Sequence, residues 1–136
     1  MPTRRYFLDA NILVSGLVWD GNERELLKMG ERKELQLVSS IYVFRELQDV
    51  FEGFGFERQK IAESMVYLRS FLELVDATEE DVKEYWGCLG DKGDVPVLAA
   101  AIRSKCILVT GDKQLKKVAR GYLRVESARD ILDLMR

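Results

Sequence analysis

Short apolar runs alternate with longer amphipathic segments along the chain, and this alternation restricts the possible folds more than any other feature. Because the intervening segments are long enough for crossover helices, neighbouring strands are expected to be parallel. A parallel sheet is covered by helices on both faces. The pattern therefore predicts an α/β fold, a three-layer α/β/α sandwich around a central, mostly parallel sheet of about five strands. The expected strands are residues 5–8, 35–38, 72–75, 107–109 and 123–125.

Residues that favour the first turn of a helix stand in the segments between these strands. Pro96 falls in the first turn of its expected helix, where a missing N–H group costs nothing. The candidate N-caps are Asn22, Ser39 or Ser40, Thr78 (with Asp81) and Ser127 (with Asp130). These start signals support the same strand–helix alternation.

Length and hydropathy favour one globular domain over residues 1–136. The chain has 47% hydrophobic and 32% charged residues, a balance that argues against disorder. Its apolar stretches are far shorter than the roughly 20 residues that span a bilayer. The N-terminus lacks the apolar segment of a signal peptide. We therefore expect a cytoplasmic protein without a membrane partner.

Composition excludes several kinds of catalytic site. The chain contains no histidine, which rules out Ser-His-Asp and Cys-His catalysis and every histidine-ligated metal. Two cysteines, Cys88 and Cys106, are too few for a zinc site or a disulfide framework and are expected to be small buried residues. The net charge of −2 argues against a globally basic nucleic-acid binder. Carboxylates and a hard cation such as Mg²⁺ or Mn²⁺ remain available.

Acidic residues stand where apolar runs pass into helical segments, and in a parallel sheet they share the edge where ligands bind. Taken singly, Asp94 and Asp112 are explained as helix N-caps, and Glu46 as a solvated helix residue. Taken together, carboxylates about 4 Å apart repel by roughly 4 kcal/mol at an effective dielectric constant near 20, unless a cation lies between them. The four residues of this predicted metal site are Asp9, Glu46, Asp94 and Asp112.

The segments around these acids resemble those of PIN domains, specifically the VapC-type and related PIN-family toxins of type II toxin–antitoxin systems. The order of the segments matches the family, and they extend over nearly the whole chain. They are residues 7–15 (FLDANILVS), 45–47 (REL), 91–101 (DKGDVPVLAAA) and 108–115 (LVTGDKQL). The resemblance implies a Mg²⁺- or Mn²⁺-dependent endoribonuclease that leaves a 5′-phosphate and a 3′-hydroxyl.

The resemblance also implies roles for individual residues. The four acids match the acidic quartet of the family, and Asn11 and Thr110 match polar residues that support it by hydrogen bonding. Asp91, three residues before Asp94, is the other candidate for the third metal ligand. Asp94 is favoured because the apolar run 95–101 follows it directly.

Partners are expected on two surfaces. Basic residues after Asp112 are candidates for RNA phosphate contacts, although a solvated helix face explains any one of them better: Lys113, Lys116, Lys117, Arg120 and Arg124. The loop FEGFGF, with Phe54 and Phe56, is hard to bury and suits a homodimer or antitoxin interface. Trp19 and Trp86 are expected in or near the core.

Other functions fit the sequence less well. A haloacid-dehalogenase-type phosphatase would need a second Asp where Asn11 stands, and a receiver domain using Asp76 would need paired acids after the first strand. The main alternative is a PIN-fold RNA-binding or adaptor module with weak or no nuclease activity in an RNA-processing complex.

Overall fold

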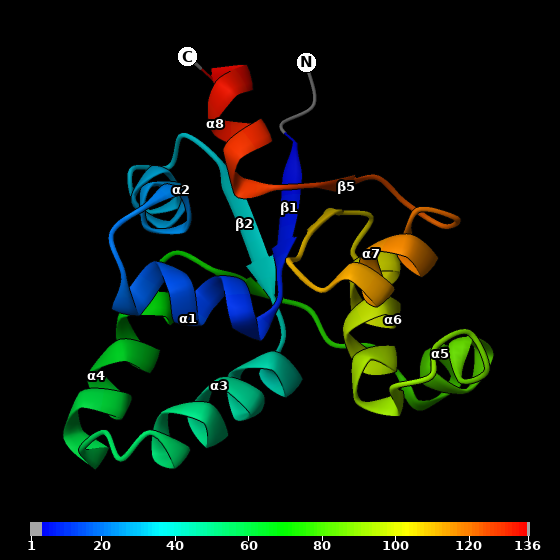
Figure 1. Cartoon of the computed structure of the whole chain (residues 1–136), viewed down its shortest axis with the longest axis horizontal. Helices are drawn as coiled ribbons and strands as arrows, with labels where there is room; N and C mark the ends of the chain where they lie inside the picture. Colours follow the sequence, from blue (N-terminus) through cyan, green and yellow to red (C-terminus); the bar gives the residue numbers. More distant parts are fainter. Residues whose placement is uncertain (1–3, 136) are drawn as a thin grey trace.

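A computed structural model describes residues 4–135, and its centre is a five-stranded sheet (Figure 1). The strand order is β3-β2-β1-β4-β5, and every neighbouring pair is parallel. In the central strand, Phe7 is paired with Val38 on one side and Leu108 on the other. The α/β class is thereby confirmed. The strands are β1 (Arg5–Leu8), β2 (Gln36–Ser39), β3 (Glu73–Leu74), β4 (Ile107–Val109) and β5 (Val125–Glu126).

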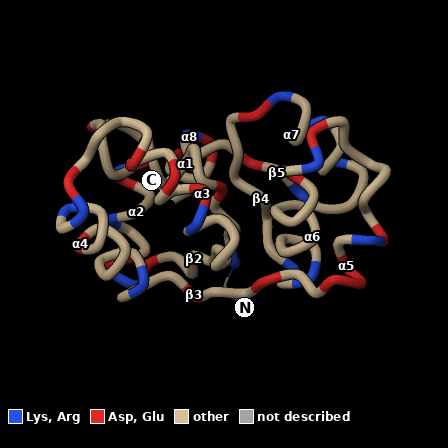
Figure 2. Tube along the Cα trace, turned by 90° about the horizontal axis from the view of Figure 1, so that it is seen from below, with Lys and Arg blue, Asp and Glu red and all other residues tan. Residues whose placement is uncertain are grey.

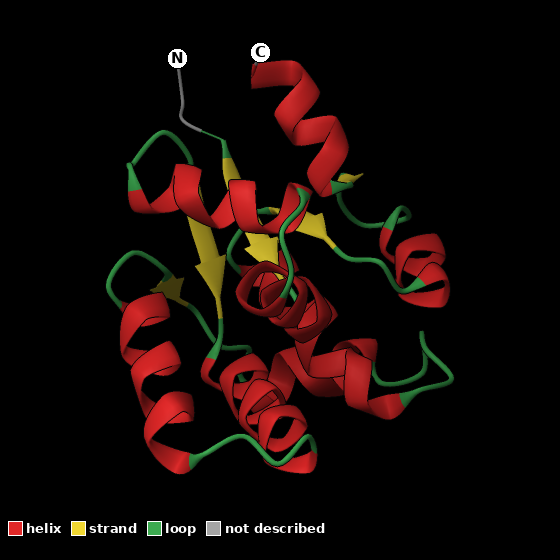
Figure 3. Ribbon diagram, turned by 60° about the vertical axis from the view of Figure 1, so that its left-hand side comes forward, coloured by secondary structure: helices red, strands yellow, loops and turns green. Residues whose placement is uncertain are grey.

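Helices lie on both sides of the strands, which gives the expected three layers (Figure 3). Helix α2 packs against both α1 and α8, α3 packs against α1 and α4, and α5 packs against α6. A short 3-10 helix, η1 (Lys92–Asp94), leads into α6. The α-helices are α1 (Ala10–Val18), α2 (Asn22–Glu31), α3 (Ile41–Gly53), α4 (Arg58–Arg69), α5 (Glu79–Tyr85), α6 (Val95–Arg103), α7 (Lys113–Ala119) and α8 (Ala128–Met135).

Three of the four residues of the central strand belong to the core. Tyr6, Phe7 and Leu8 of β1 are each at most 1% exposed, because helices cover both faces of the sheet. Residues 99–101 of α6 are buried alanines. These small side chains allow the backbone of α6 to approach its neighbours closely, so the core holds the sheet and this helix in one fixed arrangement.

Several local expectations hold, and one is wrong. Ser40 caps α3 by accepting a hydrogen bond from the Val43 N–H at 3.1 Å, and Thr78 forms a reciprocal capping box with Asp81. Asn22 is not an N-cap: α2 is entered through Gly21, whose φ of 156° an L side chain rarely adopts. Glycine therefore takes the cap position and Asn22 becomes the first helical residue.

Two expectations about burial are wrong. Trp19 is 58% and Trp86 is 49% exposed, because each is the C-cap of a helix where the chain turns away from the core. Cys106 is buried, but Cys88 is only partly so, with its Sγ 3.1 Å from the Tyr122 hydroxyl. Within residues 4–135, no helix has the length and apolar character needed to cross a membrane.

Candidate active site

Two neighbouring strands, β1 and β4, end at one edge of the sheet and place Asp9 and Asp112 there. β1 lies between β2 and β4, so the chain leaves β1 towards one side and later returns on the other. Ligands bind at such switch points, beyond the carboxyl ends of the strands. Asp9 follows β1 directly and Asp112 follows β4. In Figure 1, α1 and α3 begin beside the arrowheads of β1 and β2, so Glu46 in α3 lies towards the same edge.

Asp9 is the most buried acid of the site, with 6% of its surface exposed. Its Oδ1 accepts a hydrogen bond from the Ile12 N–H at 3.0 Å, and its Oδ2 accepts one from the Thr110 hydroxyl. Burial raises the pKa of Asp9, these hydrogen bonds lower it, and the charge of Asp112 raises it further. These hydrogen bonds hold the Asp9 carboxylate in one orientation, in which it also caps α1.

Thr110 connects Asp9 to Asp112. The Thr110 Oγ1 also accepts a hydrogen bond from the Asp112 N–H at 3.1 Å. Asp112 caps α7 through its Oδ1, which accepts from the Leu115 N–H at 2.8 Å. The capping role expected for Asp112 is confirmed, and among residues 4–135 its Oδ2 has no hydrogen-bond partner. That oxygen is available to a ligand.

Glu46 and Asp94 are partly buried carboxylates without a counter-ion. Within the described part of the chain, neither side chain makes a hydrogen bond or an ion pair. Loss of solvent contact, and then the charges of Asp94 and Asp9, raise the pKa of Glu46 to about 7. Loss of solvent contact, and then the neighbouring acids, raise the pKa of Asp94 to about 6. Asp94 has the N-cap position of α6 but makes no capping hydrogen bond, so the capping explanation fails for it.

The surroundings of Asp91 and Asp94 differ. Asp91 is exposed, and its Oδ1 accepts a hydrogen bond from the Gly93 N–H at 2.9 Å. The charges of Asp91, Asp112 and Asp9 all raise the pKa of Asp94. Asp94 is the acid that acts most on Glu46, ahead of Asp9 and Asp91. These charges favour Asp94 as the more central member of the cluster.

Tyr42 belongs to this site, although the sequence did not mark it as a site residue. Its hydroxyl donates a hydrogen bond to the Gly93 carbonyl oxygen at 2.8 Å, which ties α3 to the loop that carries Asp91 and Asp94. Burial, and then the charges of Glu46 and Asp94, raise the pKa of Tyr42. The available signal was its spacing, since residues four apart share one face of a helix.

The sequence profile of the PIN domain family matches residues 5–114, a region that contains all four acids. The chain belongs to the PIN domain family. PIN domains are generally nucleases that use divalent metal ions. No curated protein matches the sequence.

Solved structures with the same fold are more distant in sequence. VapBC2 from Rickettsia felis, bound to a DNA fragment from their promoter, has a TM-score of 0.68 and 20% identity, over 90% of this chain and 98% of that chain. PAE2754 from Pyrobaculum aerophilum has a TM-score of 0.68 and 18% identity, over 97% of this chain and 95% of that chain. FitAB bound to an IR36 DNA fragment has a TM-score of 0.63 and 15% identity, over 90% of this chain and 94% of that chain. At these identities the likeness shows a shared fold.

The donor set of this PIN domain suits a hard divalent cation. Its donors are carboxylate oxygens, and the raised pKa values of Asp9, Glu46 and Asp94 reflect a charge imbalance that a cation would relieve. Within residues 4–135, however, no three carboxylates or thiols already converge at chelating distance. Direct chelation by three carboxylates therefore requires side-chain rotation, whereas a cation that keeps several water ligands, as Mg²⁺ usually does, needs fewer direct contacts.

The remaining predicted site residues lie at the surface. Asn11 is exposed, and its side chain makes no hydrogen bond within residues 4–135. Arg124 is paired with Glu126 at 2.7 Å. The other candidate RNA contacts on or beside α7 make no ion pair in the described part of the chain: Lys113, Lys116, Lys117 and Arg120. Figure 2, seen from the side of the strand ends, shows acidic and basic segments interspersed along the chain.

Proposed function

We propose that this PIN domain protein is a Mg²⁺- or Mn²⁺-dependent endoribonuclease and the toxin component of a type II toxin–antitoxin system. The observation that carries the proposal is the group of four acids at the switch point of the sheet, two of which are partly buried and have no counter-ion among residues 4–135. Structures with this charge arrangement are stabilised when a cation binds.

Each acid has a distinct part in the proposed reaction. A bound divalent ion supplies positive charge for the phosphodiester and acidifies a water molecule. Asp9, held by Thr110, is the central ligand. Asp94 and Asp112 complete the coordination directly or through water, and Asp91 is the alternative to Asp94. Glu46 holds a cation or orients the attacking water.

The substrate is RNA, with the basic residues of α7 available for its phosphates. Their contribution makes binding dependent on salt. Asp112 is the N-cap of α7, so the first residues of that helix lie beside this acid. The candidate contacts are Lys113, Lys116, Lys117 and Arg120.

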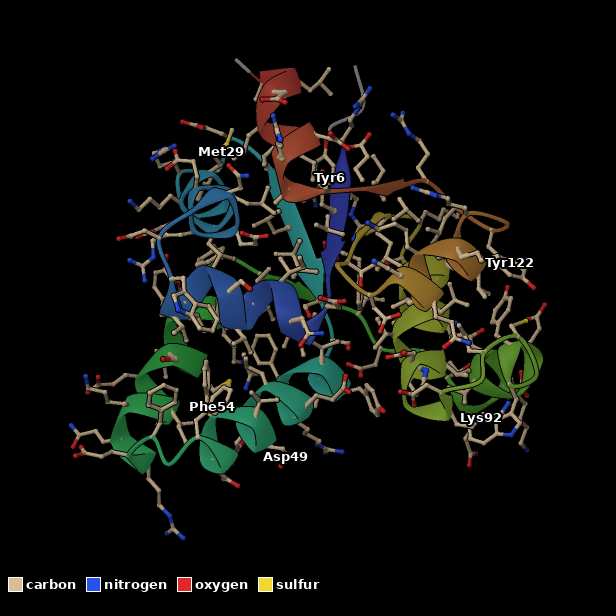
Figure 4. The ribbon with its side chains drawn as sticks, viewed as in Figure 1. Tyr6, Met29, Asp49, Phe54, Lys92 and Tyr122 are labelled. Carbon is tan, nitrogen blue, oxygen red and sulfur yellow. The ribbon has the colours of Figure 1, made fainter. Side chains whose placement is uncertain are left out.

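The proposed protein partners are a small antitoxin and a second copy of the chain, in the cytoplasm. Phe54 and Phe56 are 64% and 41% exposed, whereas Phe44 and Phe51 of the same segment are buried. In Figure 4, Phe54 lies at the turn between α3 and α4. Exposed aromatic groups of this kind suit a protein interface. The VapBC2 and FitAB structures, which share the fold, are complexes bound to DNA.

The test is cleavage of structured and unstructured RNA with Mg²⁺ or Mn²⁺, with and without a chelator. We expect cleavage by the wild type, inhibition by the chelator, and loss of activity in Asp9→Asn with an unchanged circular dichroism spectrum. Asp20→Asn is the matched control, because Asp20 is a 92% exposed side chain paired with Arg24. A folded Asp9→Asn variant with full metal-dependent activity contradicts the assignment.

One observation favours the alternative function. Because no three acids of residues 4–135 already converge on one point, an RNA-binding or adaptor module without nuclease activity also fits the fold. RNA binding by the wild type, without cleavage under any metal condition, supports the adaptor.

A further inference from the structure

A cavity of about 570 Å³ lies beside the acidic site, between the first turn of α3, the helix α5 and the first turn of α6. This volume is in the range of small-molecule binding sites. Its apolar wall is formed by Ile41, Val82, Trp86 and Pro96. A group bound here would lie on an apolar surface with charged residues around it.

The cavity adjoins the acidic site through Tyr42, although none of the four acids lines it. Tyr42 lines the cavity and also interacts electrostatically with Glu46 and Asp94. Arg45 lines it one residue before Glu46, and Pro96 lines it two residues after Asp94. The residues that line the cavity are thus close in sequence to two of the acids, and Tyr42 lies between the cavity and the acidic site.

Trp86 provides a partly exposed aromatic surface in the cavity wall. The Lys92 ammonium lies 5.5 Å from the centre of its ring and donates hydrogen bonds to the carbonyl oxygens of Trp86 at 2.6 Å and Leu89 at 3.0 Å. Figure 4 shows Lys92 beside α5. The Trp86 residue nevertheless keeps 49% of its surface exposed. Aromatic side chains of this kind stack on nucleobases, whose flat faces do not depend on base identity.

The cavity wall carries two basic and two acidic residues, and the two basic residues are available to an anionic group. Arg45 and Lys83 are exposed, and neither forms an ion pair within residues 4–135. Of the two acids in the wall, Asp76 has hydrogen-bond partners in the fold. Asp76 accepts hydrogen bonds from the Ile41 N–H at 2.8 Å and the Tyr42 N–H at 3.1 Å. Glu79 lies in the first turn of α5, where the helix dipole stabilises its charge.

We infer that this cavity binds an unpaired nucleobase of single-stranded RNA, adjacent to the phosphodiester that the acids hold. Trp86 stacks on the base, while Arg45 and Lys83 contact the flanking phosphates. The inference rests on the proposed ribonuclease function. It adds that the enzyme selects unpaired nucleotides, because a base within a duplex cannot enter the cavity or stack on the indole.

Steady-state cleavage of single-stranded RNA tests the role of the indole. We expect Trp86→Ala to raise KM roughly 10- to 100-fold with a smaller effect on kcat, which corresponds to the loss of one stacked base. Trp86→Phe keeps an aromatic face and should stay within about fivefold of the wild type. Trp19→Ala is the matched control, since Trp19 is similarly exposed but does not line the cavity. Circular dichroism confirms the fold of each variant.

Tryptophan fluorescence gives a second readout that does not depend on cleavage. In Trp19→Phe, Trp86 is the remaining tryptophan. A short single-stranded RNA, added at low salt with a chelator, should quench its emission. A chain of abasic ribose phosphates of equal length should bind without quenching. Lys83→Ala and Arg45→Ala should each reduce the salt dependence of RNA binding by about 0.7 in the log–log slope.

The outcomes separate the inference from the proposed function. If the wild type cleaves RNA and Trp86→Ala leaves KM within twofold, the base-binding cavity is wrong and the ribonuclease proposal stands. If RNA binds without quenching Trp86, the stacking contact is wrong. If the wild type neither binds nor cleaves RNA, both the proposed function and this inference fail.

Discussion

Glu46→Gln should stabilise the metal-free protein and impair its function. Glu46 is a partly buried carboxylate whose pKa is about 7, because of its loss of solvent contact and the charges of Asp94 and Asp9. The amide removes the negative charge and keeps the shape of the side chain. A residue that costs stability in the absence of its ligand is expected at a binding site.

The magnitude follows from the pKa. Holding Glu46 ionised in the fold, where its pKa is about 7 and not the ordinary 4.5, costs at most about 3 kcal/mol. Because the side chain is partly in contact with water, screening reduces this to about 1–2 kcal/mol. For a chain of 136 residues this corresponds to a Tm about 4–8 °C higher in Glu46→Gln at pH 8.

The sign of the pH dependence is also defined. The folded state binds the proton of Glu46 more tightly than the unfolded state, so stability falls as the pH rises from about 4.5 to about 7. Below this window Glu46 is protonated in both states and the penalty disappears. At pH 5 the advantage of Glu46→Gln should be about a quarter of its value at pH 8.

Thermal unfolding followed by circular dichroism measures these differences in chelator at pH 5 and pH 8. Glu63→Gln is the control, because Glu63 is an exposed acid of α4 whose bond from Gln59 an amide oxygen can also accept. Added Mg²⁺ or Mn²⁺ should stabilise the wild type by about 2.7 kcal/mol at 100 times Kd, and Glu46→Gln by less. An equal or lower Tm for Glu46→Gln at pH 8 in chelator refutes the reasoning.

Two further predictions concern residues that position the acids. Tyr42→Phe loses the 2.8 Å hydrogen bond to Gly93, so its free energy of unfolding, measured in urea, should be lower by about 0.5–1.5 kcal/mol. It should also bind the metal ion more weakly in a titration, because α3 no longer holds the loop that carries Asp94. Tyr67→Phe is the control, because it loses a 2.9 Å hydrogen bond to Glu31 and should leave metal affinity unchanged. An equal loss of metal affinity in Tyr42→Phe and Tyr67→Phe would contradict the positioning role of Tyr42. Thr110→Val removes a hydrogen bond that lowers the pKa of Asp9, so the acidic limb of the pH–rate profile should move to higher pH, while Thr110→Ser should restore it. An unchanged profile in Thr110→Val would show that this hydroxyl does not tune Asp9.

The fold was predictable because its signals are local. The runs at β1 and β4 have the residue bounds expected from the sequence, and both strands are central, with neighbours on each side. The edge strands β3 and β5 are only two residues long, shorter than their apolar runs, because an edge strand pairs on one side only. The exposed Trp19 and Trp86 were mistaken for core residues, since hydrophobicity alone does not say where a chain turns away from its core.

The sequence by itself determined the α/β alternation and the edge at which the acids collect, because strand periodicity, helix starts and chain direction are local properties. Only the tertiary structure decided how those acids are surrounded. It placed Glu46 and Asp94 together with no counter-ion in the described part of the chain, linked Tyr42 to a loop 51 residues away, and set an exposed indole in the neighbouring cavity. Desolvation and charge proximity depend on residues distant in the sequence, so packing determines them.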